Sequence, residues 1–258
     1  QRKLMTTGKD ENVFNIAVKG NFDDCQNLVK SMFSDKEFSN QINMSGVNSI
    51  NWARIIAQSV YYFYCYFLAE DDNQPINFSV PTGNFGDVYA GYLAKKLGLP
   101  INKLIVATNQ NDILHRAISK GKYEAEHVSE TISPSMDIQI ASNFERLIYD
   151  LNSHDSSQTL DDMKNIKQNG KYSIDDEKLK KINQDFLSAR MSEQETLDVI
   201  KNIYEKFNIV LDPHTAIGYG AFDKHDLKGN NIVLATAHPC KFPDAILKAI
   251  NLKSDLPD

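Results

Sequence analysis

The residues best suited to chemistry are the six from Thr82 to Asp87, TGNFGD, which join an apolar run to an amphipathic one. Gly83 and Gly86 let the main chain turn with its N–H groups facing inward at the positive end of the following helix. Donors arranged in this way bind anions. The loop lacks both the Lys-Ser or Lys-Thr of a nucleotide-triphosphate loop and the three spaced glycines of a dinucleotide site. The sequence therefore predicts a site for a single phosphate monoester.

The same loop has a second interpretation that involves no ligand. A strand-to-helix turn with glycine is a common structural feature, and Asp87 could cap the helix with its own charge. On spacing alone both interpretations stay open.

A polar stripe follows on the long segment that starts at Asn48. Asn51, Arg54 and Gln58 come after Asn48 at spacings that place side chains along one face of a helix. Arg54 offers a planar fork of donors that suits phosphate or carboxylate. This stripe forms either a polar wall that faces a ligand or a surface that faces solvent or a subunit boundary.

The rest of the same segment is apolar around most of its circumference, which predicts a central helix. The run from Ile55 to Leu68 contains Gln58, Ser59 and four tyrosines, so it is expected to be a buried helix and not a membrane span. Its aromatic residues are expected to lie in the core.

Strand-like and helical patterns alternate around the loop. Residues 78–80 and 104–108 read as strands, and residues 88–97 and 112–119 read as helices. Strand, helix and strand of these lengths predict a right-handed crossover and parallel pairing, with functional residues at the carboxyl ends of the strands. A further strand is expected over 232–236. The residues expected at this edge are Thr82, Asn84, Asn109, Thr236 and His238.

The remaining patterns complete an α/β chain. A strand is expected over 12–18, and residues 152–191 are interpreted as a peripheral helical excursion. Further helices are expected over 23–32, 34–44, 142–151, 193–207, 242–250 and the segment after Asp212-Pro213-His214-Thr215. His214 and His238 could be acid–base groups, or they could be structural residues held by hydrogen bonds.

Composition excludes some classes of function. The chain of 258 residues has a net charge of -6, which argues against a general nucleic-acid binder. Cys25, Cys65 and Cys240 form no metal-ligand spacing and suit a reducing compartment, so we expect a cytoplasmic protein that uses no metal. No segment resembles a signal peptide. The first residue is Gln1, so we expect a processed, truncated or cut chain.

Six motifs stand out along the chain, and none of them lies in 152–191. They are GNFDDCQ at 20–26, VNSINWARIIAQ at 47–58, SVPTGNFGDVYAGYLAKKLGLP at 79–100, ATNQND at 107–112, DPHTAIGY at 212–219 and TAHPCKF at 236–242. Taken together and in this order, they resemble the threonine synthases, which are pyridoxal-phosphate enzymes of the tryptophan-synthase β-subunit fold (fold type II).

The resemblance implies parallel sheets flanked by helices and roles for named residues. Main-chain donors of Gly83, Asn84, Phe85, Gly86 and Asp87 would hold the phosphate of pyridoxal 5'-phosphate, and the Thr236 hydroxyl would face the pyridine nitrogen. Substrate contacts are implied for Ser49, Asn51 and Arg54.

The implied activity is that of a carbon–oxygen lyase in threonine biosynthesis. Such an enzyme converts O-phosphohomoserine and water to L-threonine and phosphate, and it implies neither a nucleic-acid nor a membrane partner.

One feature of the family is missing. The lysine that binds the cofactor lies in a segment resembling G-P-T-x-x-F-K-D, which this sequence lacks. Lys241 lies beyond the strand that leads to Thr236 and is a poor substitute. We therefore expect a C-terminal portion, inactive alone, whose partner is the missing N-terminal part. Residues 1–41 would end a smaller α/β domain, and residues 42–258 would form most of a larger cofactor-binding one.

Two alternatives stay open. The chain could belong to another lyase or dehydratase of the same fold, for which Arg54 is the discriminating residue, since a substrate without phosphate has little use for it. It could also be a non-catalytic module that binds a phosphate ligand and lacks the half with the lysine.

Overall fold

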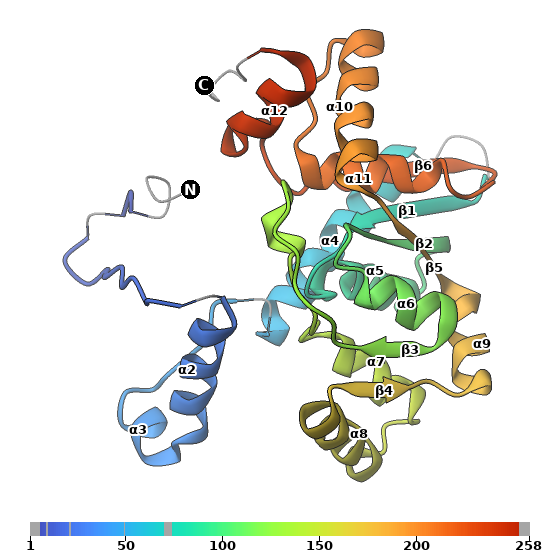
Figure 1. Cartoon of the computed structure of the whole chain (residues 1–258). Helices are drawn as coiled ribbons and strands as arrows, with labels where there is room; N and C mark the ends of the chain where they lie inside the picture. The colour runs from blue at the N-terminus through green and yellow to red at the C-terminus, as the bar shows by residue number, and fades with distance from the viewer. Residues whose placement is uncertain (1–5, 9, 21, 49, 70–73, 253–258) are drawn as a thin grey trace. The chain divides into compact units, whose positions relative to one another are not determined.

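The computed structural model describes residues 6–8, 10–20, 22–48, 50–69 and 74–252. The chain divides into two compact units, Gln1–Val47 and Asn48–Asp258 (Figure 1). The sequence predicts a domain boundary after Gln41. The assignment of these parts to a smaller and a larger domain stays a prediction.

The first unit contains two helices, α2 (Phe22–Ser34) and α3 (Lys36–Gln41), and both agree with the sequence patterns. Residues 12–18 form no strand, so that prediction is wrong, and Phe14 and Ile16 are exposed. Alternating apolar residues form a strand only where a neighbouring strand satisfies their main-chain hydrogen bonds. No described segment pairs with residues 12–18.

The second unit is built on a parallel sheet of four described strands in the order β5-β2-β1-β6. The strands are β1 (Ile76–Pro81), β2 (Ile101–Thr108), β5 (Phe186–Arg190) and β6 (Asn230–Val233). The side chains of Phe78, Val80, Leu104 and Val106 are fully buried, because helices cover both faces of the sheet. This arrangement confirms the predicted α/β fold.

Strand β5 corrects the interpretation of 152–191 as a wholly helical, peripheral region. Residues Phe186–Arg190 pair with β2, and the side chains of Phe186 and Ala189 are buried. The sequence does not predict this strand, because its five residues, FLSAR, directly follow a lysine-rich helix and do not form a longer apolar run. The strand expected over 232–236 is also shorter than predicted, because β6 ends at Val233.

Helices cover the sheet on two sides. Helices α5 (Gly86–Lys96) and α6 (Ile113–Lys120) lie on one side, and α11 (Pro213–Phe222) lies on the other (Figure 1). The other elements of this unit are α7 (Phe144–Leu151), α8 (Ser156–Asn169), α9 (Asp176–Asp185), α10 (Glu193–Phe207), α12 (Pro243–Ile250), the short antiparallel pair β3 (Lys122–Glu124) and β4 (Lys171–Ser173), and the 3₁₀ turns η1 (Pro134–Met136) and η2 (Pro239–Lys241).

Helix α4 (Trp52–Ala69) packs along α5, but it is not the buried helix that the sequence predicts. Its buried residues are Ile55, Ser59 and Tyr62. A helix that packs on one neighbour buries one stripe, and the other apolar positions stay outside. In the described chain the large apolar residues of α4 that are exposed are Trp52, Ile56, Val60, Tyr61, Tyr64, Phe67 and Leu68. No helix in the described ranges has the length and hydropathy that a membrane span requires.

The connections of the sheet reverse direction beside β1. From β1 the chain passes through α5 to β2 and later to β5, whereas α11 leads back to β6 on the opposite side of β1. In open α/β sheets, ligands bind outside the carboxyl ends of the strands where the order reverses. The TGNFGD loop after β1 and the segment after β6 both lie at this point.

The turn that leads into β6 depends on Gly229. Its φ is +100°, and a Cβ there would lie 2.0 Å from the carbonyl oxygen of Pro75, which accepts a hydrogen bond from Asn230. Gly98 has a similar φ of +105°, and a Cβ there would meet nothing within 4 Å.

We predict that Gly229→Ala lowers the free energy of unfolding by about 2 kcal/mol more than Gly98→Ala does. Both substitutions place a Cβ on a residue with a left-handed φ, which is destabilising, but Gly229→Ala also displaces Pro75. Urea unfolding of the two variants measures the difference. Equal losses would contradict the predicted clash.

Candidate functional site

A cavity of about 650 Å³ lies between α4, the start of α5 and the segment after β6. It brings together Arg54, Asp87 and Thr236, which the sequence selects from three separate motifs. None of the described residues that line the cavity is a lysine, and Lys241 lies in η2, exposed and outside the lining. The lining residues are Arg54, Gln58, Tyr61, Tyr64, Cys65, Asp87, Val233, Leu234, Ala235 and Thr236.

Arg54 contributes the positive charge of the cavity. It lies on α4 with an exposed side chain and forms no ion pair with any other described residue. Gln58, one turn later, donates from Nε2 to the Arg54 carbonyl oxygen at 3.0 Å. The guanidinium is therefore available to a phosphate or a carboxylate, which favours the ligand-facing interpretation of the stripe.

Thr236 reaches the cavity from a loop and not from a strand end. It lies beyond Val233, where β6 stops, although Leu234 still donates a main-chain hydrogen bond to Ser79 of β1 at 3.1 Å. The residue is exposed, and its hydroxyl has no hydrogen-bond partner in the described ranges. It can donate to, or accept from, a ligand in the cavity.

The TGNFGD loop carries unsatisfied main-chain donors. The N–H groups of Gly83, Asn84 and Phe85 donate to no other described residue, and those of Gly86 and Asp87 belong to the first turn of α5, which has no intrahelical acceptors. Phe85 is left-handed with a φ of +65°, and no side chain caps the helix. An anion site at these groups stays a prediction, and Asp87 alone of them lines the cavity.

The loop is held from outside by a neighbouring segment. A Cβ on Gly83 would lie 2.5 Å from the carbonyl oxygen of Ser135, so only glycine lets these two segments of the main chain approach each other. Asn143 donates its main-chain N–H to the Asn84 carbonyl oxygen at 3.1 Å. The Asn84 carbonyl oxygen is thus engaged by protein, whereas the N–H groups of Gly83, Asn84 and Phe85 have no acceptor among the described residues.

Asp87 does not cap its own helix. Its carboxylate Oδ1 accepts from the Tyr62 hydroxyl at 3.3 Å, and its carbonyl oxygen accepts from the same hydroxyl at 2.8 Å. Burial raises the pKa of Asp87 to about 6, although the bond from Tyr62 opposes the shift. The structure therefore shows no hydrogen bond by which the Asp87 side chain would cap α5.

Of the expected substrate residues, Arg54 lines the cavity and Asn51 does not. Asn51 directly precedes α4, and its side-chain oxygen accepts the Ala53 N–H at 2.9 Å, as a helix N-cap does. Ser49 lies outside the described residues. Roles for both stay predictions.

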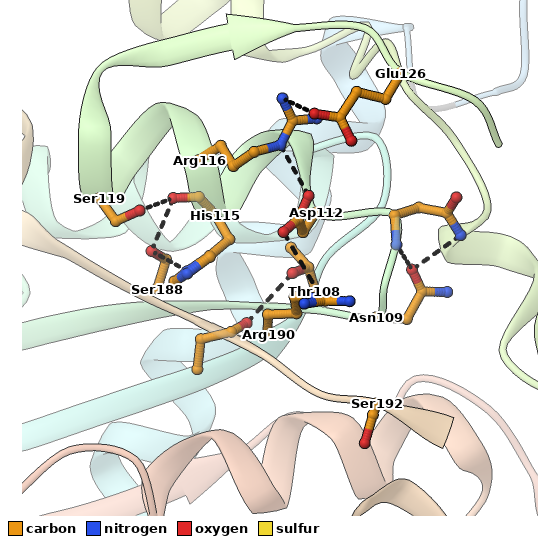
Figure 2. Close-up of polar contacts among 12 residues, drawn as sticks. Thr108, Asn109, Asp112, His115, Arg116, Ser119, Glu126, Ser188, Arg190 and Ser192 are labelled. Atoms are coloured by element: carbon orange, nitrogen blue, oxygen red, sulfur yellow. Dashed lines mark hydrogen bonds and ion pairs between the residues drawn. The ribbon is translucent and has the colours of Figure 1, made fainter. Parts of the chain in front are cut away.

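Asn109, at the end of β2, is part of a structural network. Its amide donates to the Ser133 hydroxyl at 2.9 Å and to the Asp137 carboxylate at 2.8 Å. These bonds hold the segment that packs on Gly83. Figure 2 shows further internal pairs at this edge, with Arg116 between Asp112 and Glu126 and His115 beside Ser188.

His214 and His238, the two histidines considered as acid–base groups, both have structural partners. His214 Nδ1 lies 3.0 Å from Asp212 Oδ1, and its Nε2 accepts the Ser135 N–H at 3.3 Å. Hydrogen bonds from His214 and Thr215 lower the pKa of Asp212 against its desolvation by burial. His238 caps η2 through Nδ1, which accepts the Cys240 N–H at 3.2 Å. Neither lines the cavity, which favours the structural interpretation of each.

Sequence reasoning missed Tyr61, Tyr64 and Cys65 as cavity residues. The signal was present, because Arg54, Gln58, Tyr61 and Cys65 continue one helical stripe. The stripe was not followed beyond Gln58 because the aromatic residues were assigned to the core. Tyr62 was missed as a partner of Asp87, because only the fold brings α4 against α5.

Asp87 supplies a prediction about pH. A carboxyl group whose folded pKa is about 6 and whose unfolded pKa is about 3.9 binds its proton more tightly in the folded state. Its contribution to stability is present at low pH and is lost as the pH rises from about 4 to 6. Asp87→Asn should therefore gain about 2 kcal/mol relative to the wild type between pH 4 and pH 7.

Urea unfolding of the cofactor-free protein at both pH values measures this gain. Asp175→Asn is the control, because hydrogen bonds from Lys178 lower the pKa of Asp175, so its titration lies mostly below pH 4 and its difference from wild type should change little between pH 4 and pH 7. A difference between Asp87→Asn and wild type that does not vary with pH would contradict the raised pKa.

Comparison with known proteins places this geometry in a family. The family model for the threonine synthase C-terminal region matches residues 215–258. The threonine synthases of Saccharomyces cerevisiae and Pseudomonas aeruginosa are 46% and 45% identical over 97% and 96% of this chain. The chain spans about half of their lengths, 53% and 54%.

A solved structure agrees with the whole fold. The crystal structure of pyridoxal-phosphate-bound threonine synthase from Brucella melitensis superposes with a TM-score of 0.90 at 47% identity, and it covers 98% of this chain and 55% of that one. The agreement confirms fold type II and the resemblance drawn from the six motifs. The chain belongs to the threonine synthase family, whose C-terminal half it represents.

Proposed function

We propose that this chain is the C-terminal part of an enzyme that converts O-phosphohomoserine and water to L-threonine and phosphate. The observation that carries the proposal is the single cavity lined by Arg54, Asp87 and Thr236. Three segments far apart in sequence supply a cation, the end of an anion-binding loop and a free hydroxyl, which are the groups that a phosphorylated cofactor and a phosphorylated substrate require.

The residues fit pyridoxal 5'-phosphate. The unsatisfied N–H groups of Gly83, Asn84 and Phe85, continued by Gly86 and Asp87, would hold its phosphate, and Thr236 would face its ring nitrogen. When bound, this cofactor withdraws electrons from the carbons next to the substrate amino group. The lysine that binds it covalently would come from the part of the enzyme outside this chain.

The substrate phosphate requires a second anion site. Arg54 lines the cavity from α4, a different element from the segment that carries Thr236, and its guanidinium can bind a phosphate through two parallel hydrogen bonds. Its permanent charge stabilises the dianion that leaves. The neutral hydroxyl of Thr236 does not force a proton onto a ring nitrogen, as a carboxylate would.

The partner would be the rest of the same enzyme. Ile56, Val60, Phe67 and Leu68 expose an apolar stripe on α4, next to the side of the helix that lines the cavity. Exposed apolar stripes of this kind mark interfaces. The relatives contain nearly as much chain again, which could cover this stripe and close the cavity. The cysteines, all free thiols, fit a reducing compartment such as the cytoplasm.

Arg54→Ala and Thr236→Val test the proposal as a reciprocal pair in the intact enzyme. Arg54→Ala should raise the KM for O-phosphohomoserine about 100-fold, because a charge-assisted pair is lost, and it should leave cofactor absorbance unchanged. Thr236→Val should alter the absorbance, whereas Thr236→Ser, which keeps the hydroxyl, should not.

Steady-state kinetics and absorbance spectra measure the two effects. An unaltered KM in Arg54→Ala would exclude a phosphate role for Arg54 and favour another lyase of the same fold. An unaltered spectrum in Thr236→Val would remove that residue from the cofactor site.

A further inference from the structure

Tyr62 links the two helices that form the walls of the cavity. It lies on α4 with a fully buried ring, and its hydroxyl donates to the carbonyl oxygen of Asp87 at 2.8 Å and approaches Asp87 Oδ1 at 3.3 Å. The pKa of the Tyr62 hydroxyl is raised by burial and by the charge of Asp87, so it remains a donor. The same helix carries Arg54, and Asp87 ends the phosphate loop.

The Tyr62 ring packs closely against Gly91 of α5 and Phe78 of β1. A Cβ on Gly91 of α5 would lie 2.4 Å from Cε1 of Tyr62, and the ring centroid of Phe78 in β1 lies 4.8 Å from that of Tyr62. A side chain at position 91 would clash with the ring. The packing of the ring against α5 and β1 therefore fixes the position of the hydroxyl.

The contact matters because Asp87 is a potential competitor of the phosphate. A carboxylate in the first turn of a helix is attracted to the unsatisfied N–H groups of that turn. Asp87 makes no such bond, and no side chain caps α5. Its carboxylate is instead directed toward α4 by Tyr62, which leaves the donors of the loop free.

We propose that Tyr62 is a positioning residue that prevents Asp87 from capping its own helix and so keeps the loop donors available to the cofactor phosphate. The inference rests on the proposed function, since it takes the loop to be the cofactor-phosphate site. Tyr62 itself contacts neither cofactor nor substrate in this account. It acts through the orientation of one carboxylate.

The proposal separates affinity from stability. Tyr62→Phe keeps the ring in place and removes the hydroxyl, so Asp87 can turn toward the N–H groups and replace one favourable contact with another. The affinity of the intact enzyme for pyridoxal 5'-phosphate should fall about tenfold, which corresponds to one hydrogen bond to a charged group. The double variant Y62F/D87A removes the competitor and should recover most of the affinity.

Tyr89→Phe is the matched control. It deletes a tyrosine hydroxyl that donates to Asp150 at 3.0 Å from the same helix α5, outside the cavity. Fluorescence titration with pyridoxal 5'-phosphate gives the dissociation constant of each variant, and the thermal midpoint of the cofactor-free protein gives its stability. The ³¹P NMR signal of the bound cofactor reports the surroundings of the phosphate. That signal should shift in Tyr62→Phe and not in Tyr89→Phe.

Two results would overturn the inference. If Tyr62→Phe lowers the thermal midpoint but leaves the dissociation constant and the ³¹P signal as in wild type, Tyr62 is a structural residue only. If Y62F/D87A binds the cofactor no better than Tyr62→Phe, Asp87 is not the competitor. Failure of the proposed function would differ, because wild type would then bind pyridoxal as tightly as pyridoxal 5'-phosphate.

Discussion

The candidate site depends on main-chain donors that the fold leaves without acceptors. Gly83, Asn84 and Phe85 turn from β1 into α5 with N–H groups that have no acceptor among the described residues, and the first turn of the helix adds more such groups. Unpaired donors are costly unless water or a ligand satisfies them. The surroundings maintain this state, since Ser135 packs against Gly83 and Tyr62 holds the carboxylate of Asp87 away.

Sheet topology explains why three distant motifs meet. The chain leaves β1 on one side and returns to β6 on the other, so the loop after β1 and the segment that carries Thr236 emerge side by side. Helix α4 packs on α5 and brings Arg54 to the same edge. Each motif alone is a weak signal, and only the strand order makes them one cavity.

Much of this was predictable from the sequence, and the rest was not, for physical reasons. Local periodicity identified β1, α5, β2 and α10, because each has a long and regular apolar pattern. The short strand β5 and the failed strand at 12–18 depend on pairing partners, which a local pattern does not contain. The contact between Tyr62 and Asp87 joins residues 25 positions apart and follows from packing alone. The exposed stripe of α4 was misread as core because an apolar run of this length predicts burial all round, whereas α4 packs on α5 and buries one stripe only.

The amide signals of Gly83 and Gly86 test the central claim most directly, because these residues would bind the cofactor phosphate through the main chain. The intact enzyme, labelled with ¹⁵N-glycine, is titrated with pyridoxal 5'-phosphate and, separately, with pyridoxal. We expect both signals to move downfield with the phosphorylated compound and to stay in place with pyridoxal. Signals that stay in place with both compounds, or that move equally with both, would contradict a phosphate site at this loop.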